Sequence, residues 1–445
     1  MEAYVADWIL PITTPPVRDG AIVIDRGRIL FVGPALEARA RPEYREAKWM
    51  SFGRAVILPG FVNTHTHLEL TAMRGMLEGL PFQEWIATVT RTRREHLTDE
   101  ALRASALLGV AEAIHAGITT IGDTGDSGGP FDAMIAAGIR GIAYREVFGP
   151  DPAVVEKSLE GIQARVEDMR SRETSQVRAG ISPHAPYTVS AALYKAVIEY
   201  AGRESLDLCT HTAESAAEQQ LMLSGEGDFA RSLSGRGIAW EPPGVSTINY
   251  FENLGVLEAR PLLIHCVTVD EEDTRLIAMR GARVAHCPKS NAKLGHGIAP
   301  LPAMLKAGVV VGLGTDSVAS NNRCDIIDEA RTCGLIHRGV ARSYMAPSAE
   351  TLLHLATMGG AQALGLEAEV GSLEPGKQAD IIAIDLSGAH NTPVNDPVAA
   401  IIFSASAGDV IFAAVAGRPL MSDRVILTLN EAELKTRASP LREPI

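Results

Sequence analysis

Two histidines follow a short apolar segment near residue 60. The segment 59–67 reads PGFVNTHTH and places His65 and His67 two positions apart. Residues two apart on a β-strand point to the same side, so both imidazoles would face a single point, as the ligands of a metal ion do. The structural alternative is a pair of satisfied histidines at a strand end. The apolar strand and the PGFVN sequence before the pair favour the metal site.

Three further polar residues stand at the ends of later apolar segments. His211 follows residues 206–210, His265 follows residues 262–264, and Asp316 follows residues 309–315. In a (β/α)₈ barrel the C-terminal ends of the strands are where active-site residues gather. Each residue alone could cap a helix or bind a loop amide. Five such residues, all at predicted strand ends, indicate one site.

A carboxylate lies three residues after one of these histidines. The sequence HTAE runs from His211 to Glu214. A glutamate that does not bind the metal but stands beside a metal-activated water can carry protons during hydrolysis. The alternative is a glutamate in the first turn of the next helix, where the helix dipole favours a negative charge. The position beside His211 favours the proton carrier.

The segments that carry these residues belong to an alternating pattern of strands and helices. Helical segments separate most of the strands, and Thr98 can cap the one over residues 98–116. Eight parallel strands with intervening helices predict an α/β fold, a (β/α)₈ TIM-like barrel. We expect its strands before His65 and at residues 118–122, 141–148, 178–182, 206–210, 262–266, 283–286 and 309–314.

The sequence pattern at the two ends of the chain differs from that of the middle. Short strands separated by turns dominate the first 58 residues, and the same β-rich pattern returns from residue 370. We therefore predict that residues 1–58 and 370–445 form one small β-sandwich domain. Residues 59–369 would form the metal-dependent barrel beside it.

Composition limits the classes of partner. The formal net charge is -13, with no run of basic residues, so nucleic acid and membranes are not expected as partners. The five cysteines are scattered without a CxxC pair, which indicates a reducing compartment. The first residues lack the basic and apolar regions of a signal peptide. We expect a cytoplasmic chain that acts on a small molecule, and assembly into a homo-oligomer is left open.

Taken together, the motifs resemble those of a known group of enzymes. The segments PGFVNTHTH, PHAPYTV, HTAE, HCV, HCPKSNAKLGHGIAP and GTDSVASNN are similar to those of the amidohydrolase superfamily. The closer resemblance is to its aminohydrolase branch. That branch contains the cytosine, guanine, methylthioadenosine/S-adenosylhomocysteine and aminodeoxyfutalosine deaminases, and the triazine hydrolases. The resemblance extends over nearly the whole chain, since GSLEPGKQAD at residues 371–380 is similar to the family's return into its β domain.

The resemblance implies a role for each candidate residue. His65, His67, His211 and Asp316 would bind the metal, Glu214 would carry protons, and His265 would hold the attacking water. Two-metal relatives bridge their ions with a modified lysine on the fourth barrel strand, whereas residues 178–184 read RAGISPH and lack a lysine. The resemblance therefore implies one divalent metal, with Zn²⁺ first and Fe²⁺ as the alternative. Catalytic roles would fall to Glu214, His265 and Asp316.

Four residues are candidates for substrate binding. His184, in the PHAPYTV motif, has family counterparts that contact the substrate ring. Arg145 stands where methylthioadenosine/S-adenosylhomocysteine deaminases have an arginine near the substrate. Glu69 could accept hydrogen bonds from a ribose or an amine, and Trp85 could stack on a ring. The structural alternatives are a loop-bracing histidine, an ion pair of Arg145, a solvated carboxylate and simple packing of the tryptophan.

One position departs from the methylthioadenosine group. That group has a glutamate for the ribose hydroxyls shortly past its tryptophan, whereas this chain has Arg94, with Glu95 one residue later. The sequence HTHLEL instead resembles that of chains assigned to aminodeoxyfutalosine deamination. Among nucleoside substrates we therefore favour aminodeoxyfutalosine, with methylthioadenosine, S-adenosylhomocysteine and adenosine as the others.

The expected activity is metal-dependent hydrolytic deamination of a nitrogen heterocycle, with an adenine-type nucleoside as substrate. The adjacent ring nitrogen of such a substrate would accept the proton that Glu214 carries. Two alternatives remain. One is a triazine-type chlorohydrolase or a cyclic amide hydrolase. The other is a non-catalytic, metal-stabilised binding protein, which would have no need of Glu214 beside its metal.

Overall fold

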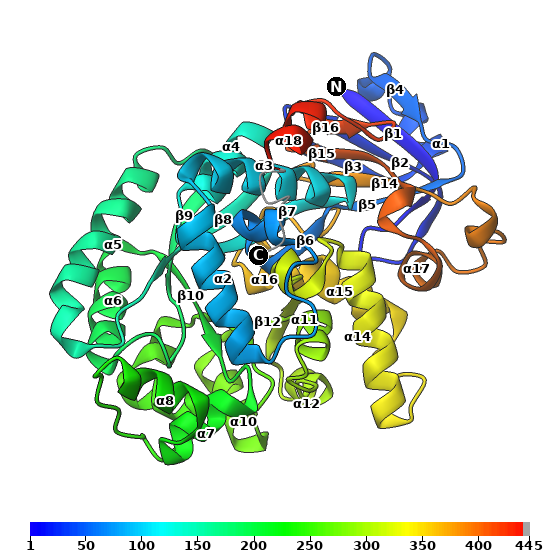
Figure 1. Ribbon diagram of the computed structural model, residues 1–445. Helices are drawn as coiled ribbons and strands as arrows, with labels where there is room; N and C mark the ends of the chain where they lie inside the picture. The colour runs from blue at the N-terminus through cyan, green and yellow to red at the C-terminus, as the bar shows by residue number, and fades with distance from the viewer. Residues whose placement is uncertain (439–445) are drawn as a thin grey trace.

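Both ends of the chain enter one mixed β-sheet. The computed structural model describes residues 1–438, and in it this sheet has the strand order β17-β16-β15-β14-β5-β1-β2-β3, with β4 paired to β1. Figure 1 shows the blue and red ends of the chain together at one side of the molecule. The strands are β1 (Glu2–Ile9), β2 (Val17–Asp25), β3 (Arg28–Pro34), β4 (Lys48–Ser51), β5 (Ala55–Pro59), β14 (Ile381–Asp385), β15 (Val410–Val415), β16 (Arg418–Ser422) and β17 (Val425–Ile426).

The two ends meet where β5 pairs with β14. These strands run antiparallel, with Ala55 opposite Asp385 and Pro59 opposite Ile381. The prediction of one β domain built from both ends is therefore confirmed. We propose the domain boundaries at residues 58 and 370, because β5 is the last N-terminal strand of the sheet and β14 is the first C-terminal one.

Alternation along β5 and β14 gives the sheet two apolar faces. Successive side chains of a strand point to opposite faces. Val56 and Ile382 belong to the large cluster that continues into the barrel, whereas Ile57 and Ile381 belong to the cluster on the far face. The contact with the barrel is close at Gly117, where a Cβ atom would lie 2.9 Å from the Ile382 side chain. The sheet thus packs beside the barrel through its apolar face.

A buried ion pair also joins the two domains. Arg140, at the start of β8, donates from Nε and Nη2 to the two carboxylate oxygens of Asp380, at 2.7 and 3.1 Å. Both side chains are 2% exposed. Asp380 also accepts a hydrogen bond from the backbone N–H of Ala416, at 2.8 Å. The carboxylate that precedes β14 therefore connects the barrel with two strands of the terminal sheet.

Eight parallel strands form the barrel in the described part of the chain, which confirms the predicted fold class. Each strand pairs with its successor, and hydrogen bonds between the ends of the series bring it close to full closure. Thr64 Oγ1 donates to the carbonyl of Leu313 at 2.8 Å, and the N–H of Asp316 donates to the carbonyl of His65 at 2.9 Å. The strands are β6 (Phe61–Thr66), β7 (Ile118–Gly125), β8 (Arg140–Val147), β9 (Val177–Pro183), β10 (Asp207–Thr212), β11 (Leu262–His265), β12 (Arg283–His286) and β13 (Val310–Leu313).

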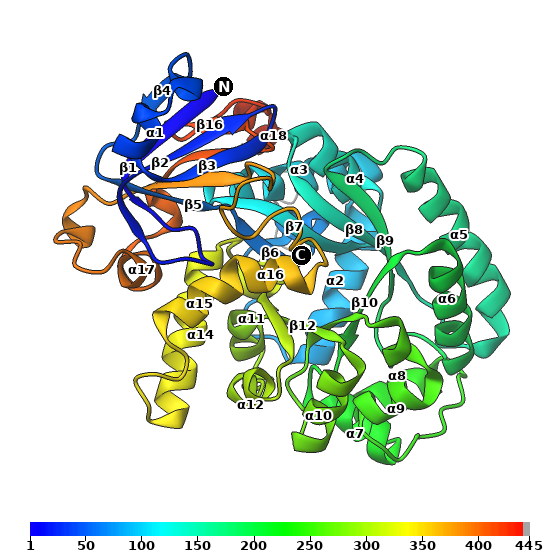
Figure 2. The ribbon, with the colours of Figure 1, turned by 180° about the vertical axis from the view of Figure 1, so that it is seen from behind.

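Helices surround the barrel, as both ribbon views show (Figures 1 and 2). The predicted cap at Thr98 is present, since its side chain accepts a hydrogen bond from the N–H of Ala101 at 3.2 Å. The helices are α1 (Ala35–Ala40), α2 (Phe82–His96), α3 (Asp99–His115), α4 (Gly129–Ala137), α5 (Val155–Arg170), α6 (Ala191–Glu204), α7 (Ala216–Ser224), α8 (Gly227–Gly235), α9 (Thr247–Leu254), α10 (Glu271–Arg280), α11 (Pro288–Lys293), α12 (Leu301–Lys306), α13 (Val318–Asn321), α14 (Ile326–Ala341), α15 (Ala349–Ala356), α16 (Met358–Ala363), α17 (Pro397–Ala399) and α18 (Glu431–Arg437).

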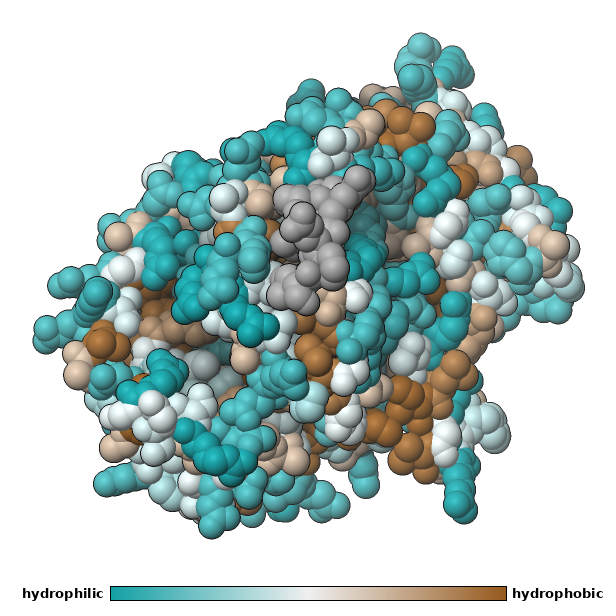
Figure 3. All heavy atoms as spheres, in the orientation of Figure 1, coloured by the Kyte–Doolittle hydropathy of each residue, from teal (hydrophilic) through white to brown (hydrophobic). Residues whose placement is uncertain are grey.

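The barrel interior is a packed core. Ile142, Tyr144, Cys209 and Ile264 form one buried apolar cluster within it, so the polar residues of the strand ends lie above an apolar floor. The outer surface is different, because hydrophilic side chains cover most of the face in Figure 3. Within residues 1–438, no helix combines the length and the apolar character needed to cross a membrane.

Candidate active site

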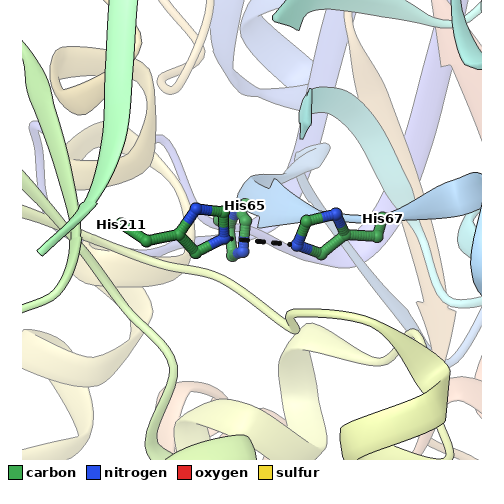
Figure 4. Close-up of side chains that lie close together, drawn as sticks. All are labelled: His65, His67 and His211. Carbon is green, nitrogen blue, oxygen red and sulfur yellow. Dashed lines mark hydrogen bonds between the residues drawn. The ribbon is translucent and has the colours of Figure 1, made fainter. Parts of the chain in front are cut away.

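Three histidines from two distant strands converge at the C-terminal end of the barrel. His65 lies on β6, His67 follows it, and His211 lies on β10. One ligand atom from each lies within 4.8 Å of the others. The Nε2 atoms of His67 and His211 are 3.3 Å apart, along the dashed line in Figure 4. The structure therefore brings the HTH pair together with the histidine of HTAE.

A carboxylate completes this cluster. Asp316 follows β13, and its Oδ1 lies 3.5 Å from Nε2 of His65 and 3.6 Å from Nε2 of His67. The hydroxyls of Ser290 and Ser320 donate to its Oδ2 at 2.5 and 2.9 Å. These bonds hold the carboxylate so that Oδ1 faces the imidazoles.

The backbone at Asp316 is in an uncommon conformation. Its φ is 56°, in the left-handed region that non-glycine residues seldom adopt. His265 shares this property, with a φ of 75°. Surrounding structure must hold such residues in place, and they concentrate at functional sites. Here the left-handed turns bring the two side chains to the barrel mouth directly at their strand ends.

The donor set of the cluster fits a divalent metal. Nε2 of His65 is buried without a hydrogen-bond partner among the described residues, and burial lowers the pKa of this imidazole to about 4. Burial also lowers the pKa of His211 well below its usual range. Neutral imidazoles offer lone pairs, and three of them with one carboxylate suit Zn²⁺ or Fe²⁺. The described strand β9 reads VRAGISP, without the lysine that would bridge a second metal.

A backbone contact fixes the orientation of one of these rings. Nδ1 of His211 lies 3.0 Å from the carbonyl oxygen of His184. Since a carbonyl only accepts, the proton of the neutral ring is on Nδ1 and the lone pair is on Nε2, which faces His67. Such support of a ligand ring by a neighbouring acceptor is a usual feature of metal sites.

Glu214 lies beside this cluster between two other histidines. Its Oε1 is 3.6 Å from Nε2 of His265 and 3.5 Å from Nε2 of His296. Burial alone would raise the pKa of Glu214, but these two imidazoles lower it below the usual value. The carboxylate is 5% exposed. The geometry thus supplies an ionised, water-shielded proton acceptor.

The turn that presents Glu214 is held by a second buried glutamate. Glu218, in the first turn of α7, accepts hydrogen bonds from the N–H of Ala213 at 2.7 Å and of Glu214 at 3.0 Å. Ala213 has a φ of 49°. Glu218 lies outside the HTAE motif and was not predicted. Its position four residues after the HTAE glutamate is the only signal that could have indicated it.

His265 is oriented from its far side by Asn291. Nδ1 of His265 lies 2.9 Å from Oδ1 of Asn291, so Nδ1–H donates to the amide oxygen and Nε2 faces Glu214. Asn291 and Ser290 both lie on α11. Both residues stand in the HCPKSNAKLGHGIAP motif. Their roles could not be predicted from it, because their contacts depend on how α11 packs over the strand ends.

His296, from the same motif, was also missed. It lies next to Glu214 with its side chain 4% exposed, and its ring lies edge-on to that of Phe82 with the centroids 4.3 Å apart. Phe82 begins α2, which crosses in front of the barrel in Figure 1. Gln83 Nε2 donates to the carbonyl of Asp228 on α8 at 2.9 Å. Helix α2 thus covers the barrel mouth and is connected to α8 on its other side.

His184 lies near the cluster, as the sequence predicts. Its ring centroid is 4.6 Å from that of His211, and its Nδ1 is 2.7 Å from Oγ1 of Thr188. Burial lowers the pKa of His184 to about 3, so the ring is neutral. A neutral imidazole beside the metal cluster can hold a heterocycle through a single hydrogen bond.

The neighbours Arg145 and Glu146 lie on opposite sides of β8. Tyr144 belongs to the interior cluster, so alternation turns Glu146 inward and Arg145 outward. Oε1 of Glu146 lies 3.9 Å from Nε2 of His184. Burial, followed by the charge of Glu69, raises the pKa of Glu146 well above its usual range. Glu146 was not predicted as a site residue, although strand alternation could have indicated it as the inward group.

Arg145 lines a cavity beside the ends of β7 and β8, next to the loop that is bonded to Glu69. The cavity has a volume of about 810 Å³ and has a mixed charged lining, with the arginines Arg93, Arg103, Arg165 and Arg437 and the carboxylates Asp99, Glu100, Asp126 and Asp132. The Nε and Nη1 atoms of Arg145 are buried and have no hydrogen-bond partner among the described residues. A ligand with hydrogen-bond acceptors could satisfy them. The role of Arg145 in substrate binding stays a prediction.

Glu69 and Trp85 have other contacts. Glu69 is 3% exposed, accepts from the N–H groups of Asp126 and Ser127, and lies 3.2 Å from Nε of Arg93. Its oxygens therefore already brace the loop after β7. Trp85 packs in the apolar cluster that contains Leu70 and Met73. The predicted substrate contacts of both residues remain untested.

Comparison with known proteins agrees with this site. The amidohydrolase family matches residues 56–420. A 5-methylthioadenosine/S-adenosylhomocysteine deaminase from Syntrophobacter fumaroxidans is 35% identical over 426 residues, which cover 94% of this chain and 92% of the relative. The crystal structure of an adenosine deaminase from Xanthomonas campestris with bound zinc has a TM-score of 0.86 at 28% identity, covering 98% of this chain and 96% of that one.

A third comparison concerns the fold alone. The aminofutalosine deaminase of Helicobacter pylori, solved with methylthio-coformycin, superimposes with a TM-score of 0.82 at 21% identity. The match covers 95% of this chain and 100% of the Helicobacter chain.

The family follows from the site geometry together with the first two comparisons. The barrel with its convergent histidines and aspartate has the arrangement and donor set of a metal-dependent hydrolase. The chain belongs to the amidohydrolase family. It is a hydrolase that acts on carbon–nitrogen bonds other than peptide bonds.

Proposed function

We propose that this protein deaminates an adenine-type nucleoside by hydrolysis. The observation that carries the proposal is the place of Glu214, a buried and ionised carboxylate next to a cluster of metal-ligand type. Its pKa is lowered against the effect of burial by His265 and His296. A binding protein would not need such a proton acceptor, whereas ring deamination does.

The metal ligands in this proposal are His65, His67, His211 and Asp316, and the metal is Zn²⁺. The zinc in the related Xanthomonas structure supports that choice over Fe²⁺. When bound, the metal would lower the pKa of a water molecule towards neutrality and so supply a nucleophile. The absence of a lysine from β9 supports a single metal at this site.

The protein's own groups would then move the protons. Glu214 accepts a proton from the water and delivers it to the ring nitrogen beside the amino-bearing carbon. His265, fixed by Asn291, orients the water through Nε2. Asp316 accepts the remaining proton from the hydroxyl group on the attacked carbon and passes it to the amino group, which leaves as ammonia while the carbonyl forms. His184 holds the ring, and Glu146 lies close enough to His184 to contact the same ring edge.

The cavity beside β8 suggests how the part of the substrate outside the adenine-type ring is bound. Arg145 presents two buried nitrogen atoms without hydrogen-bond partners among the described residues, and a guanidinium forms strong paired hydrogen bonds with a carboxylate. We therefore propose a nucleoside that carries a carboxylate-bearing substituent. S-adenosylhomocysteine and aminodeoxyfutalosine both have this chemistry, and the name of the Syntrophobacter relative supports the former.

Steady-state kinetics tests the proposal. Ammonia release is measured with S-adenosylhomocysteine, aminodeoxyfutalosine, methylthioadenosine, adenosine, cytosine and guanine under identical conditions. We expect the nucleosides to have higher kcat/KM than the free bases. Higher kcat/KM for cytosine or guanine than for every nucleoside would contradict the proposal. Ammonia from none of them would favour the triazine or cyclic amide alternative.

The variant Arg145→Gln tests the carboxylate separately. It should raise KM for S-adenosylhomocysteine and aminodeoxyfutalosine and leave adenosine nearly unchanged. The control is Arg170→Gln, which removes an exposed arginine of α5. Equal losses on adenosine and on the carboxylate-bearing nucleosides would contradict the role of Arg145 while leaving the deaminase assignment intact.

A further inference from the structure

A second cluster of metal-ligand type shares no residue with the site described above. His286 ends β12, and Cys333 and His337 lie on α14. One ligand atom from each of the three lies within 4.8 Å of the others. The three residues are 1%, 0% and 4% exposed. None of them belongs to the proposed catalytic groups.

Helical spacing explains why the two residues of α14 share one point. Cys333 and His337 are four positions apart, so their side chains lie on the same face of the helix. His286 reaches the same point from the end of a barrel strand. The cluster therefore connects a strand of the barrel to the helix that packs outside it.

The distance between the imidazoles matches that of a tetrahedral zinc site. Nε2 of His286 lies 3.4 Å from Nε2 of His337. Two nitrogens at the usual Zn–N distance and at a tetrahedral angle are about 3.3–3.4 Å apart. The separation is also close to the 3.3 Å between His67 and His211. The two clusters thus have the same spacing of nitrogen donors.

The chemistry of the donors is also suitable. Imidazole and thiolate together favour Zn²⁺ and other thiophilic ions over Mg²⁺ or Ca²⁺. Nδ1 of His286 is buried and has no hydrogen-bond partner among the described residues. With its proton on Nδ1, this ring would direct the lone pair of Nε2 towards the cluster, where Nε2 of His337 is the neighbouring atom. Cys333 is a free, buried cysteine.

We propose that His286, Cys333 and His337 form a second Zn²⁺ site, in which these three residues are the protein ligands and the fourth position is open to a water molecule. Binding exchanges the thiol proton of Cys333 for the metal: the S–H bond breaks, the S–Zn bond forms, and the proton leaves to solvent without any change of oxidation state. The ion would connect α14 to β12 and stabilise their contact.

The surroundings of the cluster give this site a structural consequence. Helix α11 begins two residues after His286 and carries Ser290 and Asn291, which hold Asp316 and His265. It is also bonded to α14, since the N–H of Lys289 donates to Oε2 of Glu329 at 3.2 Å. An ion between β12 and α14 would therefore stabilise the segment that positions two residues of the active site.

Cobalt substitution distinguishes the two sites. The metal-free chain is titrated with Co²⁺, and absorption is recorded in the near ultraviolet, where a thiolate bound to Co²⁺ gives a charge-transfer band. The proposed catalytic ligands include no sulfur, so the band would report the second site alone. We expect the band in the wild-type chain, and elemental analysis of the zinc-loaded chain to give two Zn²⁺ per chain.

Three variants make the assignment specific. Cys333→Ala and His337→Gln should each lose the band and reduce the zinc content to one per chain. Cys209→Ala removes another buried cysteine and should keep the band. Circular dichroism checks that each variant is folded, and His337→Gln retains the test where Cys333→Ala fails to fold. A wild-type chain without the band, or a band that persists in Cys333→Ala, would overturn the proposal and leave a hydrogen-bonded histidine pair.

Discussion

The Nε2 atoms of His67 and His211 lie 3.3 Å apart, although the two residues are separated by 144 positions in the chain. No local element could produce this contact. It arises because β6 and β10 belong to one parallel barrel, whose strand ends all open to the same side. Placement of the catalytic groups is therefore a consequence of barrel closure.

The first prediction concerns the metal at this contact. His211→Ala should lose the catalytic metal and nearly all activity, because it removes one of four ligands. In the Cys333→Ala background, where the second site is absent, the chain with intact catalytic ligands should hold one metal. Elemental analysis of this variant, active and fully loaded, checks the number. Two metals per chain in that background would contradict a mononuclear catalytic site.

The second prediction concerns Glu214. Glu214→Gln should keep the metal and lower kcat by roughly 10²–10⁴-fold, because an amide cannot carry the proton. Metal content and ammonia release are measured on the same preparation. Glu199→Gln, which changes an exposed glutamate of α6 in the same way, is the control. Turnover near that of the control would show that another group carries the proton.

Much of the fold and of the site could be predicted from the sequence. The HTH pair, HTAE and the aspartate after residues 309–315 could be recognised because each follows an apolar strand, and strand ends in a barrel share one side. The β domain could be predicted because both ends of the chain have the same pattern of short strands separated by turns. The predictions of the site and of the β domain depend on local sequence patterns and, for the site, on the rule that the C-terminal ends of barrel strands lie on one side.

The supporting residues could not be predicted in the same way. Asn291, Ser290 and His296 act through contacts that depend on how the segment after β12 folds over the barrel mouth. Glu69 has the right spacing from His67 to face the metal, but its carboxylate is already bound by the loop after β7. Spacing indicates a direction for a side chain, whereas its partners depend on the tertiary structure.

The third prediction concerns the hydrogen bond between Asn291 and His265. Asn291→Leu should lower kcat by about 10–100-fold, as loss of a supporting contact does around metal sites, with a small change in KM. Asn291→Asp keeps an oxygen acceptor for Nδ1–H and should restore part of the rate. A leucine variant with normal kcat, or an aspartate variant no better than leucine, would contradict the positioning role of Asn291.

The fourth prediction is a pH dependence. Glu214 must be ionised to accept a proton, so activity should fall as the pH decreases through its pKa, which lies below the usual value for glutamate. His296 is one of the groups that lower this pKa. His296→Gln should therefore move the acidic limb of the kcat/KM profile to higher pH. Profiles of the two enzymes that coincide at acidic pH would exclude His296 as a cause of the shift.

The last prediction concerns the ion pair that joins the two domains. Arg140 and Asp380 are both 2% exposed and are joined by two hydrogen bonds. Asp380→Asn would leave the guanidinium buried opposite a neutral amide, and removal of one partner of a buried pair costs about 3–5 kcal/mol. Urea denaturation of the two proteins should show a loss of this size in the free energy of unfolding. The control is Asp168→Asn, which removes a partner of Arg172 at the surface and should cost less than about 1 kcal/mol.

Glu369 also contacts Arg140, but its side chain is 44% exposed. Water therefore competes for this contact, and Glu369 does not compensate for the lost charge of Asp380. The double variant Arg140→Met/Asp380→Leu should recover part of the loss, because an apolar pair leaves no charge without a partner. Equal stabilities of Asp380→Asn and Asp168→Asn would show that the contact between the barrel and the terminal sheet depends on apolar packing alone.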